Sequence, residues 1–203
     1  MDRIIRHIEP KKLLDIGANI GDFTKNILRE VPNCIAVMVE ANPYCEPYLK
    51  TVGQQYEIVG LSDKVGVFDL FVENNNPVGT GASFYKENTQ WYEEGNYHSI
   101  QVNTQTLDSL SYFDGSSIDL IKLDVQGSEL DIINGGLSTI TRAKYVLIEV
   151  SLLQYNEGAP LMDAVVEKMT SLNFSIADIV EYHKMNNVIF QLDILFKNQT
   201  FLW

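Results

Sequence analysis

Short apolar runs alternate with amphipathic segments along most of the chain. In the amphipathic segments, apolar residues recur every three to four positions, which is typical of one face of a helix. Such segments cover residues 22–31, a stretch that begins at Pro43, another near Ser128, and Pro160–Leu172. Apolar strands joined by amphipathic helices indicate buried parallel strands in an α/β sheet. The five runs that we expect to be strands are Lys12–Ala18, Cys34–Glu40, Tyr56–Leu61, Ser117–Val125 and Lys144–Val150.

The end of the chain departs from this alternation. Phe174–Val180 and Val188–Lys197 both have strand patterns, and only the seven residues EYHKMNN separate them. A parallel crossover needs a dozen or more residues. The two strands are therefore predicted to form an antiparallel hairpin.

A long excursion over residues 65–103 also breaks the rhythm. Its ends, Val65–Val72 and Ile100–Asn103, have strand patterns, and the polar stretch between them is rich in aromatic residues. Long excursions inside a compact domain are usually functional loops or lids. We interpret this one as a substrate-facing cap inserted into a single domain of residues 1–203, with a disordered decoration as the alternative.

Composition narrows the class of protein. With 203 residues, 45% hydrophobic and 21% charged, the chain fits one globular domain. Its net charge of −12 makes nucleic acid an unfavourable partner. No apolar run approaches the roughly 18 residues of a membrane span, and residues 1–12 have no apolar core of a secretory signal. Cys34 and Cys45 have no disulfide or metal spacing. We therefore expect a cytoplasmic protein without membrane association, and we leave its oligomeric state open.

The turn after the first strand carries candidate chemistry. Asp15, Gly17, Asn19 and Gly21 stand at alternate positions just before a helix. A glycine turn lets a ligand approach the backbone, and a helix N-terminus attracts anions. The dinucleotide pattern G-x-G-x-x-G, counted from Gly17, would need glycine at Asn19 and at Asp22. A nicotinamide-dependent oxidoreductase is therefore disfavoured, and no P-loop is present.

An acid followed by small residues at alternate positions resembles the first motif of class I S-adenosylmethionine-dependent methyltransferases. Between about Lys12 and Phe196, the segments LLDIGANIGDFT, VEANP, GLSD, TLDSL, IKLDVQGSELDIINGG and LDILF resemble the FkbM-type methyltransferase family. This resemblance implies a Rossmann-like, mostly parallel seven-stranded sheet with a C-terminal antiparallel hairpin. It also implies methyl transfer from S-adenosylmethionine, mostly to hydroxyl groups of sugars, glycans or natural products. A non-catalytic S-adenosylmethionine-binding module is the alternative.

The resemblance implies a donor site at the ends of the first strands. Glu40, at the end of the second strand, is expected to accept hydrogen bonds from both ribose hydroxyls. Asp15 is expected to orient the amino group of the donor, directly or through water. Asn42 is expected either to flank the adenine or, equally well, to be the N-cap before Pro43. The other predicted donor-binding residues are Gly17, Ala18, Asn19, Gly21, Thr24, Ala41, Asn42, Ser62, Asp63 and Asp124.

Catalysis is assigned to acids near the fourth and fifth strands. Asp124 closes the fourth strand and is the preferred general base, with Glu129 or Glu149 as reserves. Lys122 lies on the same face two residues earlier, and a buried lysine needs an ionic partner, either Asp124 or Glu149. Asp124, Glu129 and Glu149 could together hold a divalent cation, but the sequence does not favour a metal.

The acceptor is expected to lie beneath the excursion. Tyr85, Trp91 and Tyr97 could stack on a sugar ring or a flat apolar acceptor. His98 is the histidine placed nearest to the substrate, whereas His7 and His183 are expected at the surface. After the fourth strand, Ser128 and Asp131 are predicted to form a variant capping box at the start of a helix.

Overall fold

The computed structural model of the chain describes Ile4 and residues 8–201, without the side chain of Asp114, so the prediction for His7 lies outside the described residues. Seven strands form the main sheet in the order β3-β2-β1-β7-β8-β10-β9. Their bounds are β1 Lys12–Ile16, β2 Ile35–Glu40, β3 Gln55–Ile58, β7 Ile118–Leu123, β8 Ala143–Ser151, β9 Phe174–Met185 and β10 Val188–Asn198.

Strands β3, β2, β1, β7 and β8 are parallel, and β10 runs antiparallel to both of its neighbours. The predicted C-terminal hairpin is thus confirmed, with β9 at the sheet edge. Its connection is much shorter than predicted, since only Asn186 and Asn187 separate the strands. Both have positive φ angles, of 50° and 64°. A two-residue hairpin turn of this kind needs positive φ at both positions, which asparagine tolerates.

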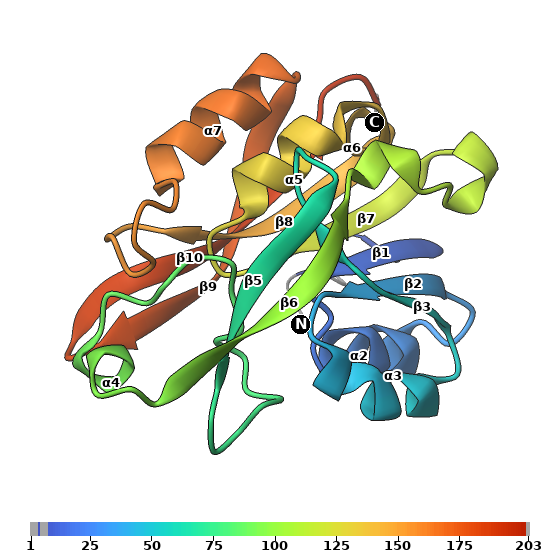
Figure 1. Cartoon of the computed structure of the whole chain (residues 1–203). Helices are drawn as coiled ribbons and strands as arrows, with labels where there is room; N and C mark the ends of the chain where they lie inside the picture. The colour runs from blue at the N-terminus through green and yellow to red at the C-terminus, as the bar shows by residue number, and fades with distance from the viewer. Residues whose placement is uncertain (1–3, 5–7, 202–203) are drawn as a thin grey trace.

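Helices cover both faces of the main sheet (Figure 1). Because neighbouring residues of a strand point to opposite faces, Leu13 packs with Ile27 of α2, whereas Leu14 packs with Ile132 of α5. No helix among the described residues is both long and apolar enough to span a membrane. The helices are α2 Asp22–Glu30 and α3 Glu46–Val52 on one side and α5 Glu129–Gly135, α6 Leu137–Thr141 and α7 Met162–Ser171 on the other, with α4 Gln90–Glu93 and the short 3-10 turns η1 Pro43–Cys45, η2 Leu107–Ser109 and η3 Phe113–Gly115.

The excursion forms most of a second, three-stranded sheet in the order β4-β6-β5 (Figure 1). Its strands are β4 Gly60–Leu61, β5 Gly66–Glu73 and β6 Tyr97–Gln105. The single strand predicted over Tyr56–Leu61 is therefore wrong, because this run is divided between the two sheets. Gly60 lies at the crossing point, where an added Cβ would come within 2.7 Å of the Phe84 ring. The absence of a side chain lets the backbone pass between the sheets there.

Candidate functional site

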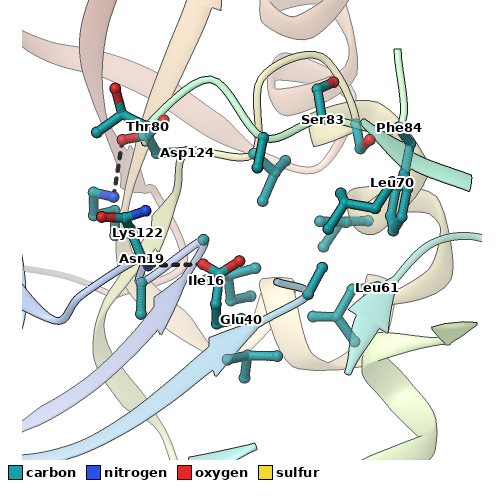
Figure 2. A pocket seen from close by; sticks show the side chains of 18 of the residues that line it. Ile16, Asn19, Glu40, Leu61, Leu70, Thr80, Ser83, Phe84, Lys122 and Asp124 are labelled. Atoms are coloured by element: carbon teal, nitrogen blue, oxygen red, sulfur yellow. Dashed lines mark hydrogen bonds and ion pairs between the residues drawn. The ribbon is translucent and has the colours of Figure 1, made fainter. Parts of the chain in front are cut away.

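A first cavity of about 260 Å³ lies at the carboxyl ends of β1, β2 and β7, and the second sheet closes it. Figure 2 shows that polar side chains, including Glu40 and Asp124, gather at one end of this cavity. Apolar side chains, including Leu70 and Phe84, gather at the other end (Figure 2). The space suits a ligand with one strongly polar and one flat apolar part.

The turn after β1 approaches the loop after β7 very closely. A Cβ added to Gly17, whose φ is 75°, would lie 1.8 Å from the carbonyl oxygen of Asp124. Only glycine fits this position. Asn19 has a φ of 48°, as its small polar side chain allows, and its side-chain amide donates to the carbonyl oxygen of Val78 at 2.9 Å. The excursion is thus tied directly to the turn.

Glu40 is fixed by the backbone on both sides. Its Oε2 accepts a hydrogen bond from the N–H of Asn19 at 2.7 Å, and its Oε1 accepts one from the N–H of Asn42 at 2.8 Å. Burial raises the pKa of Glu40, although these two bonds oppose the rise. Each carboxylate oxygen accepts about two hydrogen bonds, so Glu40 can still receive two donors from the cavity.

A row of ionisable side chains crosses the α2 face of the main sheet. A layer of buried leucines packs against α2 and ends near the carboxyl edge of the sheet. Two positions further along the strands, the same face carries Asp15 on β1, Lys122 on β7 and Glu149 on β8. Because β10 is antiparallel, its Asp193 pairs directly opposite Glu149. Strand alternation thus places charge where the sheet meets the cavities.

Lys122 links the first two acids of this site. Its Nζ lies 3.0 Å from Oδ2 of Asp124 and 3.8 Å from Oδ1 of the fully buried Asp15. Asp15 Oδ2 also accepts a hydrogen bond from the hydroxyl of Thr24 at 2.6 Å. Burial would lower the pKa of Lys122, but the two carboxylates raise it above its ordinary value. Conversely, burial would raise the pKa of Asp124, but Lys122 holds it below its usual value.

A second cavity of about 500 Å³ adjoins the first, and Gly79, Thr80 and Asp124 line both. Its lining is rich in carboxylates and aromatic rings, and it contains no lysine or arginine among the described residues. The remaining lining residues are Glu73, Asn76, Gly81, Glu87, Tyr97, Gln126, Glu149, Tyr155, His183, Phe190 and Gln191.

Two glutamines connect Asp124 to Glu149 across this second cavity. Nε2 of Gln126 donates to Asp124 Oδ1 at 3.0 Å and to Glu149 Oε2 at 2.5 Å. Nε2 of Gln191 donates to the same Glu149 oxygen at 2.9 Å. Burial, together with repulsion from Asp124 and Asp193, raises the pKa of Glu149 to about 9. Glu149 therefore holds a proton at neutral pH.

This protonation predicts the pH dependence of a Glu149→Gln variant. An acid whose pKa is raised on folding keeps a proton that the unfolded chain has released, so the contribution of Glu149 to wild-type stability falls between about pH 4.5 and about pH 9. The uncharged glutamine removes this contribution. We expect the free energy of unfolding of Glu149→Gln to exceed that of the wild type increasingly from pH 5 to pH 8.5, as measured by urea denaturation. Exposed Glu93→Gln is the control, and parallel pH profiles of Glu149→Gln and the wild type would contradict the raised pKa.

Glu129 faces the backbone rather than a cavity. It is buried and its carboxylate accepts hydrogen bonds from the N–H groups of Val125 at 3.2 Å and of Gly127 at 3.1 Å. The predicted capping box of Ser128 and Asp131 is wrong, because the Ser128 side chain makes no cap hydrogen bond. Ser128 lines the first cavity, and its Oγ is buried without a partner among the described residues.

The structure brings only some of the predicted residues to a cavity. The first cavity is lined by Gly17, Ala18, Asn19, Glu40, Ala41, Lys122 and Asp124, and the second by Tyr97, Asp124 and Glu149. The predicted residues that line neither are Asp15, Gly21, Thr24, Asn42, Ser62, Asp63, Tyr85, Trp91, His98 and Glu129.

Several of these outlying residues have other contacts. Asn42 caps the turn at Pro43, as one of its two interpretations predicts. The Tyr85 hydroxyl donates to Asp131 at 2.8 Å. Trp91 is 47% exposed, and the ring of His98 pairs with Asn74 on the outside of the excursion.

Sequence reasoning missed the lining that the excursion provides and the contacts of His183. The excursion was expected to cover the acceptor alone. Its residues Leu70, Phe84 and Thr80 also line the first cavity. His183, expected to be solvated, lies with Nε2 3.3 Å from Asp193 Oδ1 and 3.7 Å from Glu149 Oε1. His183 lies beyond the predicted strand Phe174–Val180, and its partners come from β8 and β10, so the sequence pattern gave no signal for these contacts.

Known proteins resemble this chain in sequence or in fold. Residues 15–176 match the methyltransferase FkbM domain. The chain is 27% identical, over 182 residues, to the 2-O-methyltransferase NoeI of Sinorhizobium fredii, a match that covers 78% of this chain and 71% of NoeI.

Solved structures at low sequence identity share the fold. Magnesium protoporphyrin IX methyltransferase from Synechocystis PCC 6803 with bound SAM (S-adenosylmethionine) has a TM-score of 0.54 at 8% identity, covering 92% of this chain and 69% of that one. TrmK of M. capricolum in complex with S-adenosyl-homocysteine has a TM-score of 0.51 at 10% identity, covering 98% and 67%. The expected class I methyltransferase fold is confirmed. Since the matched domain spans most of its length, this chain belongs to the FkbM family of S-adenosylmethionine-dependent methyltransferases.

Proposed function

We propose that this enzyme methylates a hydroxyl group of a sugar, glycan or natural product. One observation carries the proposal, namely that Asp124 lines two adjoining cavities of different character. The first has the polar and apolar ends that a nucleoside-linked amino acid requires, and the second has the polar and aromatic lining of a carbohydrate site. The relative NoeI, by its name a 2-O-methyltransferase, supports oxygen as the acceptor atom.

The first cavity is proposed to hold the methyl donor. Glu40 would accept hydrogen bonds from the ribose hydroxyls, and the apolar end formed by Leu61, Leu70 and Phe84 would take the adenine. The unpartnered hydroxyl of Ser128 offers a further polar contact there. Bound S-adenosylmethionine supplies the methyl group on a positively charged sulfur. Asp124 supplies negative charge where the two cavities meet, and Lys122 and Gln126 hold its carboxylate in place.

The second cavity is proposed to hold the acceptor. Its carboxylates Glu73, Glu87 and Asp124 would repel phosphorylated or carboxylated molecules and accept hydrogen bonds from hydroxyl groups. The rings of Tyr97, Tyr155 and Phe190 would pack against the apolar face of a sugar. A neutral or cationic carbohydrate fits this lining best.

Two alternatives make different predictions. A nicotinamide enzyme would bind NAD, although Asn19 and Asp22 stand where its glycines belong. A non-catalytic module would bind S-adenosylhomocysteine without turnover. Calorimetry with NAD and with S-adenosylhomocysteine distinguishes the nicotinamide enzyme from the proposed methyltransferase. Transfer of a labelled methyl group to a panel of sugars distinguishes the non-catalytic module from it.

The remaining features of the proposal follow from charge and sequence. We propose that residues 1–203 form one domain with the excursion as its cap, that the protein acts in the cytoplasm, and that nucleic acid is not its acceptor. The net charge of −12 supports the last point.

Asp124→Asn tests the proposed role of Asp124 at the junction of the two cavities, the place where both are lined by this residue. Because the variant keeps the shape of the side chain but loses its charge, we expect kcat to fall by about 10²-fold. Affinity for S-adenosylhomocysteine should change much less, because that product lacks the positive charge. The control is Asp69→Asn, an exposed position on β5 that lines neither cavity. A kcat close to that of the wild type would contradict the role of Asp124.

A further inference from the structure

An alcohol that accepts a methyl group must lose its proton, so O-methylation calls for a base at the acceptor. Neither acid closest to the junction suits this task. Asp124 is paired with Lys122 at 3.0 Å, and its pKa is held below the ordinary value in spite of burial, so its carboxylate is a weak base. Glu149 keeps its own proton up to about pH 9.

Among the residues that the structure describes, His183 is the one histidine that lines the second cavity. It lies on β9, and its side chain is 34% exposed. The cavity that it lines is the one that also contains Asp124. A histidine that lines such a cavity can accept the proton of a substrate hydroxyl through a ring nitrogen.

Asp193 is placed to orient this ring. Its Oδ1 lies 3.3 Å from Nε2 of His183, across the β9–β10 pair. Glu149 Oε1 lies 3.7 Å from the same nitrogen. With Nε2–H donated to Asp193, the lone pair for proton transfer lies on Nδ1. The other charged groups near this pair are Asp124 after β7 and Glu181 on β9, which act on Asp193.

We propose that His183 is the general base of the methyl transfer and that Asp193 is its positioning residue, an inference that rests on the proposed O-methylation. The acceptor oxygen forms a bond to the methyl carbon while its proton passes to Nδ1 of His183. The carbon–sulfur bond breaks, and its electron pair remains on sulfur as the thioether of S-adenosylhomocysteine. The imidazolium then releases the proton to solvent through the exposed side of the ring.

The test compares His183→Gln, Asp193→Asn and the control His98→Gln, whose ring lies outside both cavities. His183→Gln should lower kcat by about 10²- to 10⁴-fold and leave the affinity for S-adenosylhomocysteine within about twofold. In the wild type, kcat should fall at low pH as one group takes up a proton. The pH profile of His183→Gln should lack this decrease. His98→Gln should behave as the wild type in every assay.

Asp193→Asn provides a second variant should His183→Gln unfold. Loss of the negative charge should shift the ionisation in kcat to lower pH. The same downward shift should occur in the titration of the His183 ring followed by NMR without any substrate, a readout independent of turnover. Added imidazole should partly restore the activity of His183→Gln.

The alternative occupant of this cluster is a metal ion, because one ligand atom each of Glu149, His183 and Asp193 lies within 4.8 Å of the others. Loss of activity on chelation, restored by a divalent cation that neither His183→Gln nor Asp193→Asn retains, would overturn the proposal. An unchanged pH profile in His183→Gln would also overturn it while leaving the proposed function intact. A wild type that methylates no hydroxyl acceptor would instead refute the proposed function and this inference with it.

Discussion

Lys122→Met is expected to lower the free energy of unfolding by about 3–5 kcal/mol. The substitution keeps the aliphatic stem beside the Phe23 ring, which lies 5.3 Å from Nζ in the wild type. It removes the ammonium group that pairs with Asp124 and with the fully buried Asp15. The carboxylate of Asp15 is then left in a dry environment without a cation, a far larger cost than the loss of a surface ion pair.

Urea denaturation at neutral pH measures this effect. Lys50→Met is the matched control, because Lys50 pairs with Glu46 at 3.1 Å on the exposed face of α3 and its loss should change the stability far less. Adding Asp15→Asn to Lys122→Met should recover part of the loss. Equal stabilities of Lys122→Met and Lys50→Met would mean that the site tolerates unpaired charge.

Glu40→Gln is expected to weaken donor binding by about 30- to 1,000-fold, which corresponds to roughly 2–4 kcal/mol. The wild-type carboxylate accepts two backbone hydrogen bonds and still has capacity for the ribose hydroxyls. A glutamine side chain has one acceptor oxygen, and its NH₂ group would face a backbone N–H. The variant therefore loses charge and also disturbs the turns that shape the cavity.

Calorimetric titration with S-adenosylhomocysteine measures this loss, and near-UV circular dichroism checks that the variant is folded. Exposed Glu30→Gln at the end of α2 is the control and should bind as the wild type does. Unchanged affinity in Glu40→Gln would remove Glu40 from the donor site.

The fold was predictable because most of its determinants are local. Apolar runs and helical periodicity identify the parallel strands, and the short connection after Val180 identifies the hairpin. The division of Tyr56–Leu61 between two sheets was not predictable, because an unbroken apolar run carries no sign of the point where the backbone changes partners. Only the contacts of Gly60 with Phe84 and Thr104, which lie far along the chain, explain it.

The donor end of the site was easier to predict than the acceptor end. Gly17 and Asn19 follow β1, and Glu40 ends β2, so the ends of two neighbouring parallel strands, both recognisable in the sequence, bring these residues together. The cluster of Glu149, His183 and Asp193 comes from three strands, and its assembly depends on their register, which includes bulges between β9 and β10. Glu129 shows the opposite case, since its place five residues after Asp124, at the start of a helix, indicated chemistry, whereas backbone N–H groups occupy both of its oxygens.

The two-residue turn at Asn186–Asn187 has a consequence for how this enzyme can change. Side chains of a strand alternate between the faces of a sheet, so if the turn keeps its two residues, one residue inserted at the start of β10, unless a bulge absorbs it, would exchange the two faces of β10 relative to β9. Asp193 would then point away from His183, and apolar Leu192 would take its place. The turn itself can therefore lengthen freely, whereas insertions within β10 are constrained by parity, and even-numbered ones are those that leave the pairing of His183 with Asp193 possible.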